Sequence, residues 1–450
     1  MTSLNNALSL PRSLADGLLL RRATPADMEA VADLNGRILA DEGESPQVLA
    51  DWTKDLMSGR HPTTTAQDFI VGEDTNTGRI VSSICLIPQV WRYEDIPFGV
   101  GRPELVVTEP AYRRRGLVRT SFEAIHTMSA SRGHWVQGIT GIAWFYRQFG
   151  YEYALPLGGA RHLPLADVPG LKDGEPEPFQ IRPANAADIP ILMKLYERQC
   201  AGKLVTTEID EIRWRYDLNG HSQDSIQKLW VNCILDPEGR VIGYYSTSAH
   251  PWKERLIVWE VVVAEGISLH AALPTVTRAL KAQAQAHQPQ AGIKAKPITT
   301  LRFSLGLEHP LYETLAAKLG PFQKPYAWYI RVADLPGFIR HIAPVLEKRL
   351  AGSVMSGYSG ELKISFFRDG LRLAFEQGRL VEAVHWSPPD SDHHWDGAEF
   401  PPLVFLQLLF GHRSLDELRY AFPDCYADEE PALLLKALFP KRVSLVFPLG

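Results

Sequence analysis

The alternation of apolar and polar positions predicts a chain that mixes strands with helices. Residues 104–108 and 256–263 are apolar runs bounded by polar residues, which is typical of buried strands. Val118, Phe122 and Ile125 recur instead at helical spacing and place an apolar face on one helix. The pattern therefore favours an α+β fold built on mixed sheets.

An internal repeat is the clearest sign of domain organisation. Residues 21–28 (RRATPADM) reappear as residues 182–189 (RPANAADI), at an offset of 182 − 21 = 161 positions. Each copy follows an apolar run and has an N-cap residue, Thr24 or Asn185, with an aspartate three positions later. Two domains of one fold, each opening with a strand and a helix, is the economical explanation. The alternative is a coincidence between two common capping sequences.

Two changes in composition suggest where the domains end. Residues 164–178 are rich in proline, glycine and charge, which suits a linker. A second boundary is expected near residues 334–337, after a strand-like run. The expected domains are residues 1–163, a linker at 164–178, and residues 179–335 and 336–450.

The last hundred-odd residues have a different pattern. Three runs around Asp-Gly and Gln-Gly turns predict an antiparallel meander at 361–367, 371–376 and 379–386. Three helices are expected after it, at 401–410, 414–421 and 429–439. Strands followed by helices describe a small α+β unit.

Composition narrows the classes of protein that remain. The 450 residues exceed one small fold, and 45% apolar content excludes wholesale disorder. With 47 basic against 52 acidic residues, net −5, neither nucleic acid nor an anionic membrane surface is an expected partner. The four cysteines form no Cys-x-x-Cys pair, which favours a reducing, cytoplasmic setting. No signal peptide or transmembrane helix is predicted.

The sharpest motif follows the strand at residues 104–108. That strand leads through Pro110 into the run Arg113, Arg114, Arg115, Gly116, Leu117, Val118 and Arg119, which opens a helix. A basic, glycine-containing turn at a helix N-terminus can bind a pyrophosphate, because its N–H groups and the helix dipole favour anions. The alternative is a solvated, basic helix start.

This motif resembles the acetyl-coenzyme A motif of the GNAT acetyltransferases, Gln/Arg-x-x-Gly-x-Gly/Ala. Arg113 and Gly116 match it, whereas Val118 departs from its last position. The expected order after the motif is a strand at 134–140, a short helix at 143–149 and a strand at 151–155, which resembles the GNAT core with its two splayed parallel strands. The resemblance implies acetyl-coenzyme A as co-substrate. It implies that these residues bind the coenzyme: Leu105, Val106, Val107, Arg113, Arg114, Arg115, Gly116, Leu117, Val118 and Arg119.

Nearly the full length resembles the Eis (enhanced intracellular survival) acetyltransferases. Those proteins combine a catalytic GNAT domain, a degenerate GNAT domain and a C-terminal domain that resembles a sterol carrier protein. The resemblance implies transfer of an acetyl group to a primary amine, on a small molecule or a peptide, by direct attack, and a homo-oligomer. After the strand at 256–263 the second copy has no Arg-x-x-Gly-x-Gly/Ala, so it is expected to lack a pyrophosphate site.

Three residues are candidates for the catalytic proton transfers. Tyr146 stands at the position of the family's general acid, where its hydroxyl would protonate the leaving thiolate, with a core aromatic residue whose hydroxyl caps a helix as the alternative. Glu104 lies 113 − 104 = 9 residues before the motif and is one candidate base, with a solvated strand residue as the alternative. The resemblance implies another base, the terminal carboxylate, here on Gly450, although Eis chains end in an aromatic residue.

Other conspicuous residues have plainer explanations. A cluster of histidines and aspartates between His385 and Asp396 lies in a loop without regular ligand spacing, so no metal site is predicted. Trp214 and Tyr216 suit packing between a helix and the core. A different class of function also stays open, namely a binding protein that holds an apolar ligand in its C-terminal domain and only senses coenzyme A.

Overall fold

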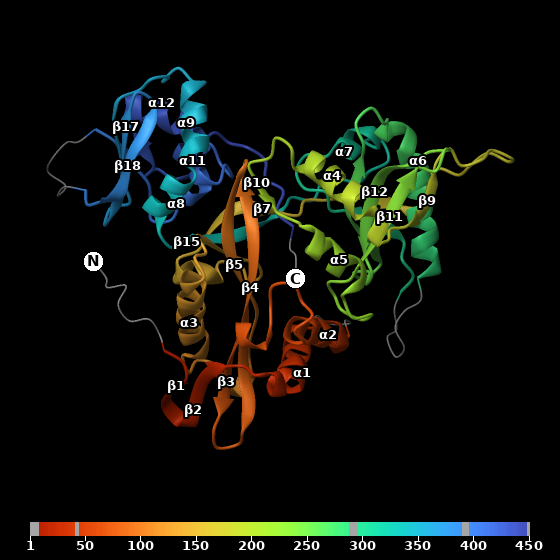
Figure 1. Ribbon diagram of the computed structural model, residues 1–450, viewed down its shortest axis with the longest axis horizontal. Helices are drawn as coiled ribbons and strands as arrows, with labels where there is room; N and C mark the ends of the chain where they lie inside the picture. Colours follow the sequence, from red (N-terminus) through yellow and green to blue (C-terminus); the bar gives the residue numbers. More distant parts are fainter. Residues whose placement is uncertain (1–8, 41–44, 288–295, 389–395, 448–450) are drawn as a thin grey trace.

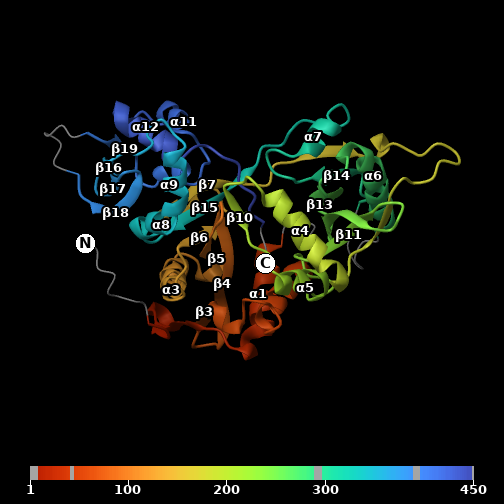
Figure 2. The same cartoon turned by 45° about the horizontal axis from the view of Figure 1, so that its top comes forward.

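The computed structural model describes residues 9–40, 45–287, 296–388 and 396–447. Their strands form three sheets, of nine, six and five strands. Figures 1 and 2 show three lobes, one around each sheet, which we number in the order of the sheets. The lobe of the nine-stranded sheet lies between the lobe of the six-stranded sheet and that of the five-stranded sheet. This mixed α+β architecture confirms the fold class expected from the sequence.

The first sheet has the order β1-β2-β3-β4-β5-β6-β15-β7, and β10 pairs with β4. Its strands are β1 (Arg12–Ser13), β2 (Leu18–Arg22), β3 (Phe69–Asp74), β4 (Arg79–Tyr93), β5 (Ile96–Thr108), β6 (Val136–Ile139), β7 (Glu152–Leu157), β10 (Val205–Thr207) and β15 (Tyr326–Val332). Helices α1 (Met28–Leu39) and α2 (Pro46–Met57) pack on one face, and α3 (Leu117–Ser131) packs on the other (Figure 1). The helix predicted from Val118, Phe122 and Ile125 is thus confirmed, with Phe122 and Ile125 fully buried.

The second sheet has the order β8-β14-β13-β12-β11-β9. Its strands are β8 (Arg161–Pro164), β9 (Gln180–Pro183), β11 (Leu229–Leu235), β12 (Val241–Ser248), β13 (Arg255–Val263) and β14 (Thr300–Phe303), with helices α4 (Ile189–Cys200), α5 (Glu211–Asn219), α6 (Leu269–Ala286) and α7 (Pro310–Thr314). The parallel pair β13 and β14, with α6 between them in sequence, repeats the arrangement of β5, α3 and β6.

The sequence repeat forms the same local structure twice. The guanidinium of Arg21 binds both carboxylate oxygens of Asp27 at 2.8 Å, and that of Arg182 binds both oxygens of Asp188 at 2.7 Å. Both aspartates also complete a capping box at the start of a short 3-10 turn that leads into α1 or α4. The 161-residue offset therefore reflects two equivalent strand-to-helix junctions.

The first and second expected domains exchange one strand each, so that each sheet contains a strand from the other domain. Residues 161–164, of which 161–163 were expected in the first domain and 164 at the start of the linker, form β8 and pair with β14 of the second sheet. Residues 326–332, expected in the second domain, form β15 and lie between β6 and β7 of the first sheet, antiparallel to both. Trp328, Tyr329 and Ile330 are fully buried there, because a central strand is covered on both faces.

The third lobe contains the predicted meander and helices. Its strands are β16 (Gly360–Ser365), β17 (Gly370–Glu376), β18 (Arg379–Trp386), β19 (Ala398–Glu399) and β20 (Tyr426–Ala427), and its helices are α8 (Leu335–His341), α9 (Ala343–Ala351), α10 (Phe405–Leu409), α11 (Leu415–Ala421) and α12 (Glu429–Leu438). The antiparallel order β16-β17-β18 and the capping box of Ser414 and Glu417 are both confirmed.

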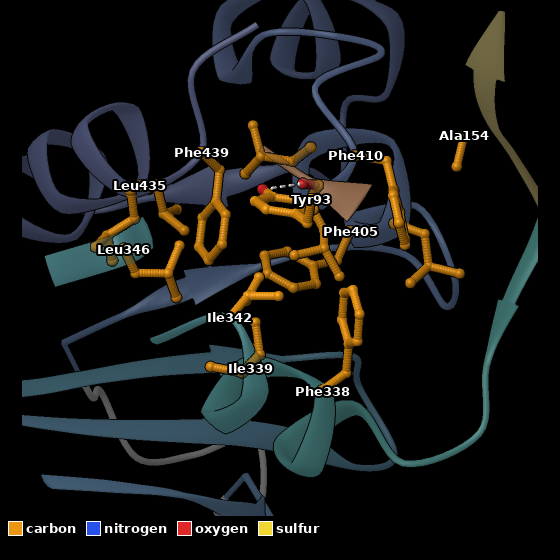
Figure 3. Packing of buried hydrophobic residues seen from close by; sticks show 14 of the residues in the cluster. Tyr93, Ala154, Phe338, Ile339, Ile342, Leu346, Phe405, Phe410, Leu435 and Phe439 are labelled. Carbon is orange, nitrogen blue, oxygen red and sulfur yellow. Dashed lines mark hydrogen bonds between the residues drawn. The ribbon is translucent and has the colours of Figure 1, made fainter. Parts of the chain in front are cut away.

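This lobe shares its core with the first sheet. Tyr93 of β4 is fully buried, and Figure 3 shows it among Phe338, Phe405 and Phe410 of the third lobe. Its hydroxyl donates a hydrogen bond to the carbonyl of Leu409 at 2.7 Å. The first and third lobes are therefore joined by a continuous apolar cluster.

Candidate acetyl-coenzyme A site

Strand β5 contains a β-bulge shortly before it ends. Ser83 of β4 pairs with Val107 and Cys85 pairs with Glu104, so a single residue of β4 lies opposite two residues of β5. Leu105, within the bulge, has a φ of +52°. A bulge increases the local twist and turns a strand away from its neighbour.

Strands β5 and β6 separate beyond their first two pairs. Their parallel pairing is limited to Val100 with Val136 and Gly101 with Gln137. β5 nevertheless continues to Thr108, so its last residues, including the predicted Leu105, Val106 and Val107, have no strand partner on the β6 side among the described residues. The expected gap between two splayed parallel strands is thus present.

The turn after β5 ends on a glycine that exposes the start of α3. Gly116 is the N-cap of α3 with a φ of +81°, a conformation that glycine adopts without strain. A Cβ placed there would meet no heavy atom within 4 Å, so the space above the glycine is open. Among the described residues no side chain caps the helix, so its first N–H groups stay available at this end.

Four arginines surround this helix start. The Arg113 Nε donates to the Thr108 carbonyl at 3.3 Å, and Arg115 donates to the Ala111 carbonyl at 3.2 Å. Arg119 lies 5.8 Å from the centroid of the Phe149 ring. Within the described ranges none of these three, nor Arg114, forms an ion pair with a carboxylate. Four unneutralised positive charges at the positive end of a helix dipole favour a polyanion.

The two apolar residues of the motif pack the start of α3 against the core. Leu117 is buried, and Val118 packs against the core cluster between α3 and the sheet. The valine that departs from the family motif therefore lies toward the core, so its bulk leaves the turn free.

Tyr146 lies on the short 3-10 helix Phe145–Phe149, which follows β6. Its side chain is 4% exposed and contacts the rings of Phe122 and Tyr329, whose centroids are 5.8 and 5.3 Å away. Burial raises the pKa of Tyr146 strongly, and the negative charge of Glu104 acts in the same direction. The phenol is therefore protonated at neutral pH, as a proton donor must be. Its oxygen accepts a hydrogen bond from the backbone N–H of Ile142, whereas its own proton has no protein acceptor among the described residues.

Glu104 lies on β5 in a salt bridge that sequence reasoning did not foresee. Its Oε1 accepts a hydrogen bond from the guanidinium of Arg102, whose side chain is only 3% exposed. Arg102 also lies over the ring of Trp328 at 4.9 Å. One carboxylate oxygen of this candidate base is thus already engaged.

The end of the chain returns to the first sheet. Val443 and Leu445 exchange backbone hydrogen bonds of 2.8 Å with residues 204 and 205, beside β10. The Phe447 N–H donates to the hydroxyl of Thr207 at 2.9 Å. Gly450, the other candidate base, lies outside the described residues. The apolar sequence of the tail was the only signal for this docking.

Tyrosines of the exchanged strand complete the surroundings of Tyr146. Tyr153 accepts hydrogen bonds from the Trp144 N–H at 2.9 Å and from the Tyr329 hydroxyl at 2.6 Å, and its hydroxyl lies 3.0 Å from that of Tyr326. Tyr326 and Tyr329 belong to β15, which sequence reasoning assigned to the second half. No local sequence signal could place them here.

The other residues singled out earlier lie away from this site. Trp214 and Tyr216 are buried, in agreement with a packing role. Of the histidine and aspartate cluster, His385 and Asp396 are described, whereas residues 390–394 lie outside the described residues. Groups of side chains able to hold a metal ion are absent from the described part of the chain. None of the helices within the described ranges is both long and apolar enough to cross a membrane.

Comparison with known proteins agrees with this geometry. Residues 20–154 match the family model described as "Acetyltransferase (GNAT) domain". The match runs from within β2 to within β7 and includes the turn at Gly116 and Tyr146. No curated protein is significantly similar to the chain in sequence.

Solved structures resemble the chain over nearly its whole length. A GCN5-related N-acetyltransferase from Kribbella flavida is 16% identical, with a TM-score of 0.61 over 95% of this chain and 97% of the other. One from Anabaena variabilis is 12% identical, with a TM-score of 0.64 over 95% and 99%. Eis1 from Mycobacterium abscessus is 14% identical, with a TM-score of 0.57 over 95% and 98%. At these identities the likeness shows the fold, which is that of the GNAT acetyltransferases.

Proposed function

We propose that the chain is an N-acetyltransferase that moves the acetyl group of acetyl-coenzyme A to a primary amine. The observation that supports this most is the open N-terminus of α3 at Gly116, surrounded by four arginines without carboxylate partners and placed at the gap between β5 and β6. The site fits the pyrophosphate of the coenzyme in charge and in the space above Gly116.

The roles of the residues follow from their positions. The α3 N–H groups and Arg113, Arg114, Arg115 and Arg119 would bind the pyrophosphate, and the free edge of Leu105, Val106 and Val107 would hydrogen-bond the pantetheine arm. As the amine forms its bond to the carbonyl carbon, the carbon–sulfur bond breaks. Tyr146 would then give its proton to the departing sulfur.

Two groups remain candidates for accepting the amine proton. Glu104 lies on the strand beside the gap, although Arg102 already binds one of its oxygens. The terminal carboxylate of Gly450 is supported by the docking of residues 443–447 along β10, which brings the tail to the first sheet.

The proposal extends to the organisation of the chain. Residues 1–163 would be the catalytic GNAT domain, 179–335 a second GNAT domain without coenzyme, and 336–450 a domain resembling a sterol carrier protein, with 164–178 as linker. We place the enzyme in the cytoplasm as a homo-oligomer, with a small-molecule or peptide amine as acceptor and no metal.

Thiol release with acetyl-coenzyme A, measured across a panel of primary amines, tests the proposal. Arg114→Ala/Arg115→Ala should raise the KM for acetyl-coenzyme A by about tenfold or more, because two charge-assisted contacts are lost. Arg368→Ala/Arg379→Ala, which removes two exposed arginines of the third lobe, is the matched control. Equal KM values for both variants would refute the site. Binding of acetyl-coenzyme A without turnover on any amine would refute the enzymatic role.

A further inference from the structure

The second sheet has an open pocket at the end opposite to the start of α6. Its volume is about 460 Å³, and it lies where the exchanged strand β8 meets the beginning of β13 and β14. His162 comes from the first half of the chain, whereas Arg255, Thr300 and Lys318 come from the second. The strand exchange therefore creates this pocket.

Basic side chains gather on this face of the sheet. Arg255 pairs with Thr300, and Arg302 pairs with His162 two rows further along the sheet, so the two arginines lie on the same face. The guanidiniums of Arg255 and Arg302 lie 5.4 and 5.6 Å from the centroid of the same ring, that of Trp252. Two positive charges are thus held close together beside the pocket.

These charges have no anionic partner within the described residues. Neither Arg255, Arg302 nor Lys318 forms an ion pair, and Asp167 is the one carboxylate among the residues that line the pocket. Burial and the charge of Arg255 lower the pKa of Arg302. By contrast, the half-buried Arg182 and Arg278 each bind a carboxylate.

His162 lies close enough to this cluster to feel the charges of Arg255 and Arg302. The Nε2 atom of His162 is buried and makes no hydrogen bond. Burial, followed by the charges of Arg255 and Arg302, lowers the pKa of His162, so its ring is neutral at pH 7 and has one nitrogen able to donate. A neutral ring adds no further positive charge, so the positive charge of this face comes from its arginines and lysine.

We infer that this pocket binds a small polyanion that bears carboxylate or phosphate groups. Arg255 and Lys318 would contact the anion directly, the neutral ring of His162 would line the site, and Arg302 would add to the positive potential. Guanidinium groups match both kinds of oxyanion, and the volume exceeds the needs of a single inorganic phosphate. Because β8 belongs to the first half, a bound anion would also stabilise the strand exchange.

Calorimetric titration of the full chain with citrate and with inorganic phosphate tests this inference. Arg255→Gln should weaken binding by about tenfold or more, while the exposed Arg379→Gln should leave it unchanged. The tighter of the two probes indicates whether carboxylates or phosphates are preferred. No binding of either probe, or equal binding by both variants, would overturn the inference.

The arginines of α3 are a second place where an anion could bind, so the titration is repeated with Arg114→Ala/Arg115→Ala. Unchanged binding by this variant supports the pocket, and loss of binding only in this variant overturns it. Lys318→Gln, an exposed position, provides a further test if Arg255→Gln does not fold. It should weaken binding severalfold, and citrate should raise the unfolding temperature of the wild type more than that of this variant.

Discussion

The two strand–turn–helix units of this chain share a backbone plan but differ in how the helix begins. In the first unit eight residues, 109–116, separate β5 from α3, and the turn ends at Gly116 without a side-chain cap. In the second unit only five residues, 264–268, separate β13 from α6. There the hydroxyl of Ser268 accepts a hydrogen bond from the Ala271 N–H at 3.2 Å. The first helix leaves its N–H groups without a side-chain cap among the described residues, whereas the second uses its own serine to satisfy one of them.

The tyrosines that follow the second parallel strand differ in whether their hydroxyl proton has an acceptor in the protein. Tyr146 follows β6 and Tyr312 follows β14. The Tyr312 hydroxyl accepts a hydrogen bond from the Leu305 N–H and lies within 3.3 Å of the carbonyl oxygens of Phe303, Gly159 and Gly306. A hydroxyl held in this way has a structural role. Under the proposed function, the same position would serve stability in one unit and proton donation in the other.

The largest expected effect distinguishes these two tyrosines. Tyr146→Phe should lower turnover by about 100-fold or more, because the leaving thiolate loses its proton donor, while acetyl-coenzyme A binding persists. Tyr312→Phe should leave turnover near the wild-type value and lower the free energy of unfolding by about 1 to 3 kcal/mol. Steady-state kinetics and urea unfolding of both variants check this. Equal turnover in the two variants would contradict the assignment.

The second expected effect is a pH dependence of stability that comes from Glu260, a residue beside the β-bulge that both units share. Where β5 has the apolar Val107 paired with Ser83, β13 has Glu260 paired with Ser246. Glu260 is 4% exposed and accepts hydrogen bonds from the Tyr244 and Ser246 hydroxyls at 2.7 and 2.8 Å. Burial raises its pKa from 4.5 to about 7, so the folded state binds this proton more tightly than the unfolded state.

Stability from this group is therefore complete below pH 4.5 and is lost as the pH rises to about 7. The loss is on the order of 3 kcal/mol. Glu260→Gln keeps a neutral side chain of the same shape and should remove this part of the pH dependence. Urea unfolding of both proteins between pH 4.5 and pH 8 measures the difference, and parallel curves for wild type and variant would show that the prediction is wrong.

A third prediction compares two glycines that have the same backbone conformation. Gly116 and Gly266 have φ values of +81° and +78°, and a Cβ on either would meet no heavy atom within 4 Å. Valine should strain both turns similarly, by about 1 to 2 kcal/mol. Only Gly116→Val should also weaken acetyl-coenzyme A binding, by about tenfold or more, because only that turn is proposed to approach a phosphate closely. Calorimetry on both variants gives the answer, and equal weakening would argue against the first turn as the site.

Local features of the fold could be predicted from the sequence because short-range physics determines them. The capping boxes at Thr24 and Asn185, the α3 start at Gly116 and the three-stranded meander all depend on residues within a few positions of one another. The basic turn that forms the candidate site belongs to this group. Its charge and its glycine are visible without any tertiary information.

Features that depend on distant parts of the chain could not be predicted in this way. The apolar run at residues 328–332 was identifiable as a strand, but nothing in it specifies that it lies between β6 and β7 rather than in the second sheet. The ion pair of Arg102 with Glu104 depends on burial beneath Trp328, which lies on that exchanged strand. The surroundings of Tyr146 were missed for the same reason.

The smallest expected effect concerns the cap that closes the second helix. Ser268→Ala removes the hydroxyl that accepts from the Ala271 N–H, so the free energy of unfolding should fall by about 1 kcal/mol. The KM for acetyl-coenzyme A should stay at the wild-type value, since the α6 start is not proposed to bind the coenzyme. Ser268→Asp, which restores an acceptor and adds charge at the helix N-terminus, should recover the lost stability. A rise in KM with Ser268→Ala would mean that both helix starts contact the coenzyme, which would remove the distinction between the two units.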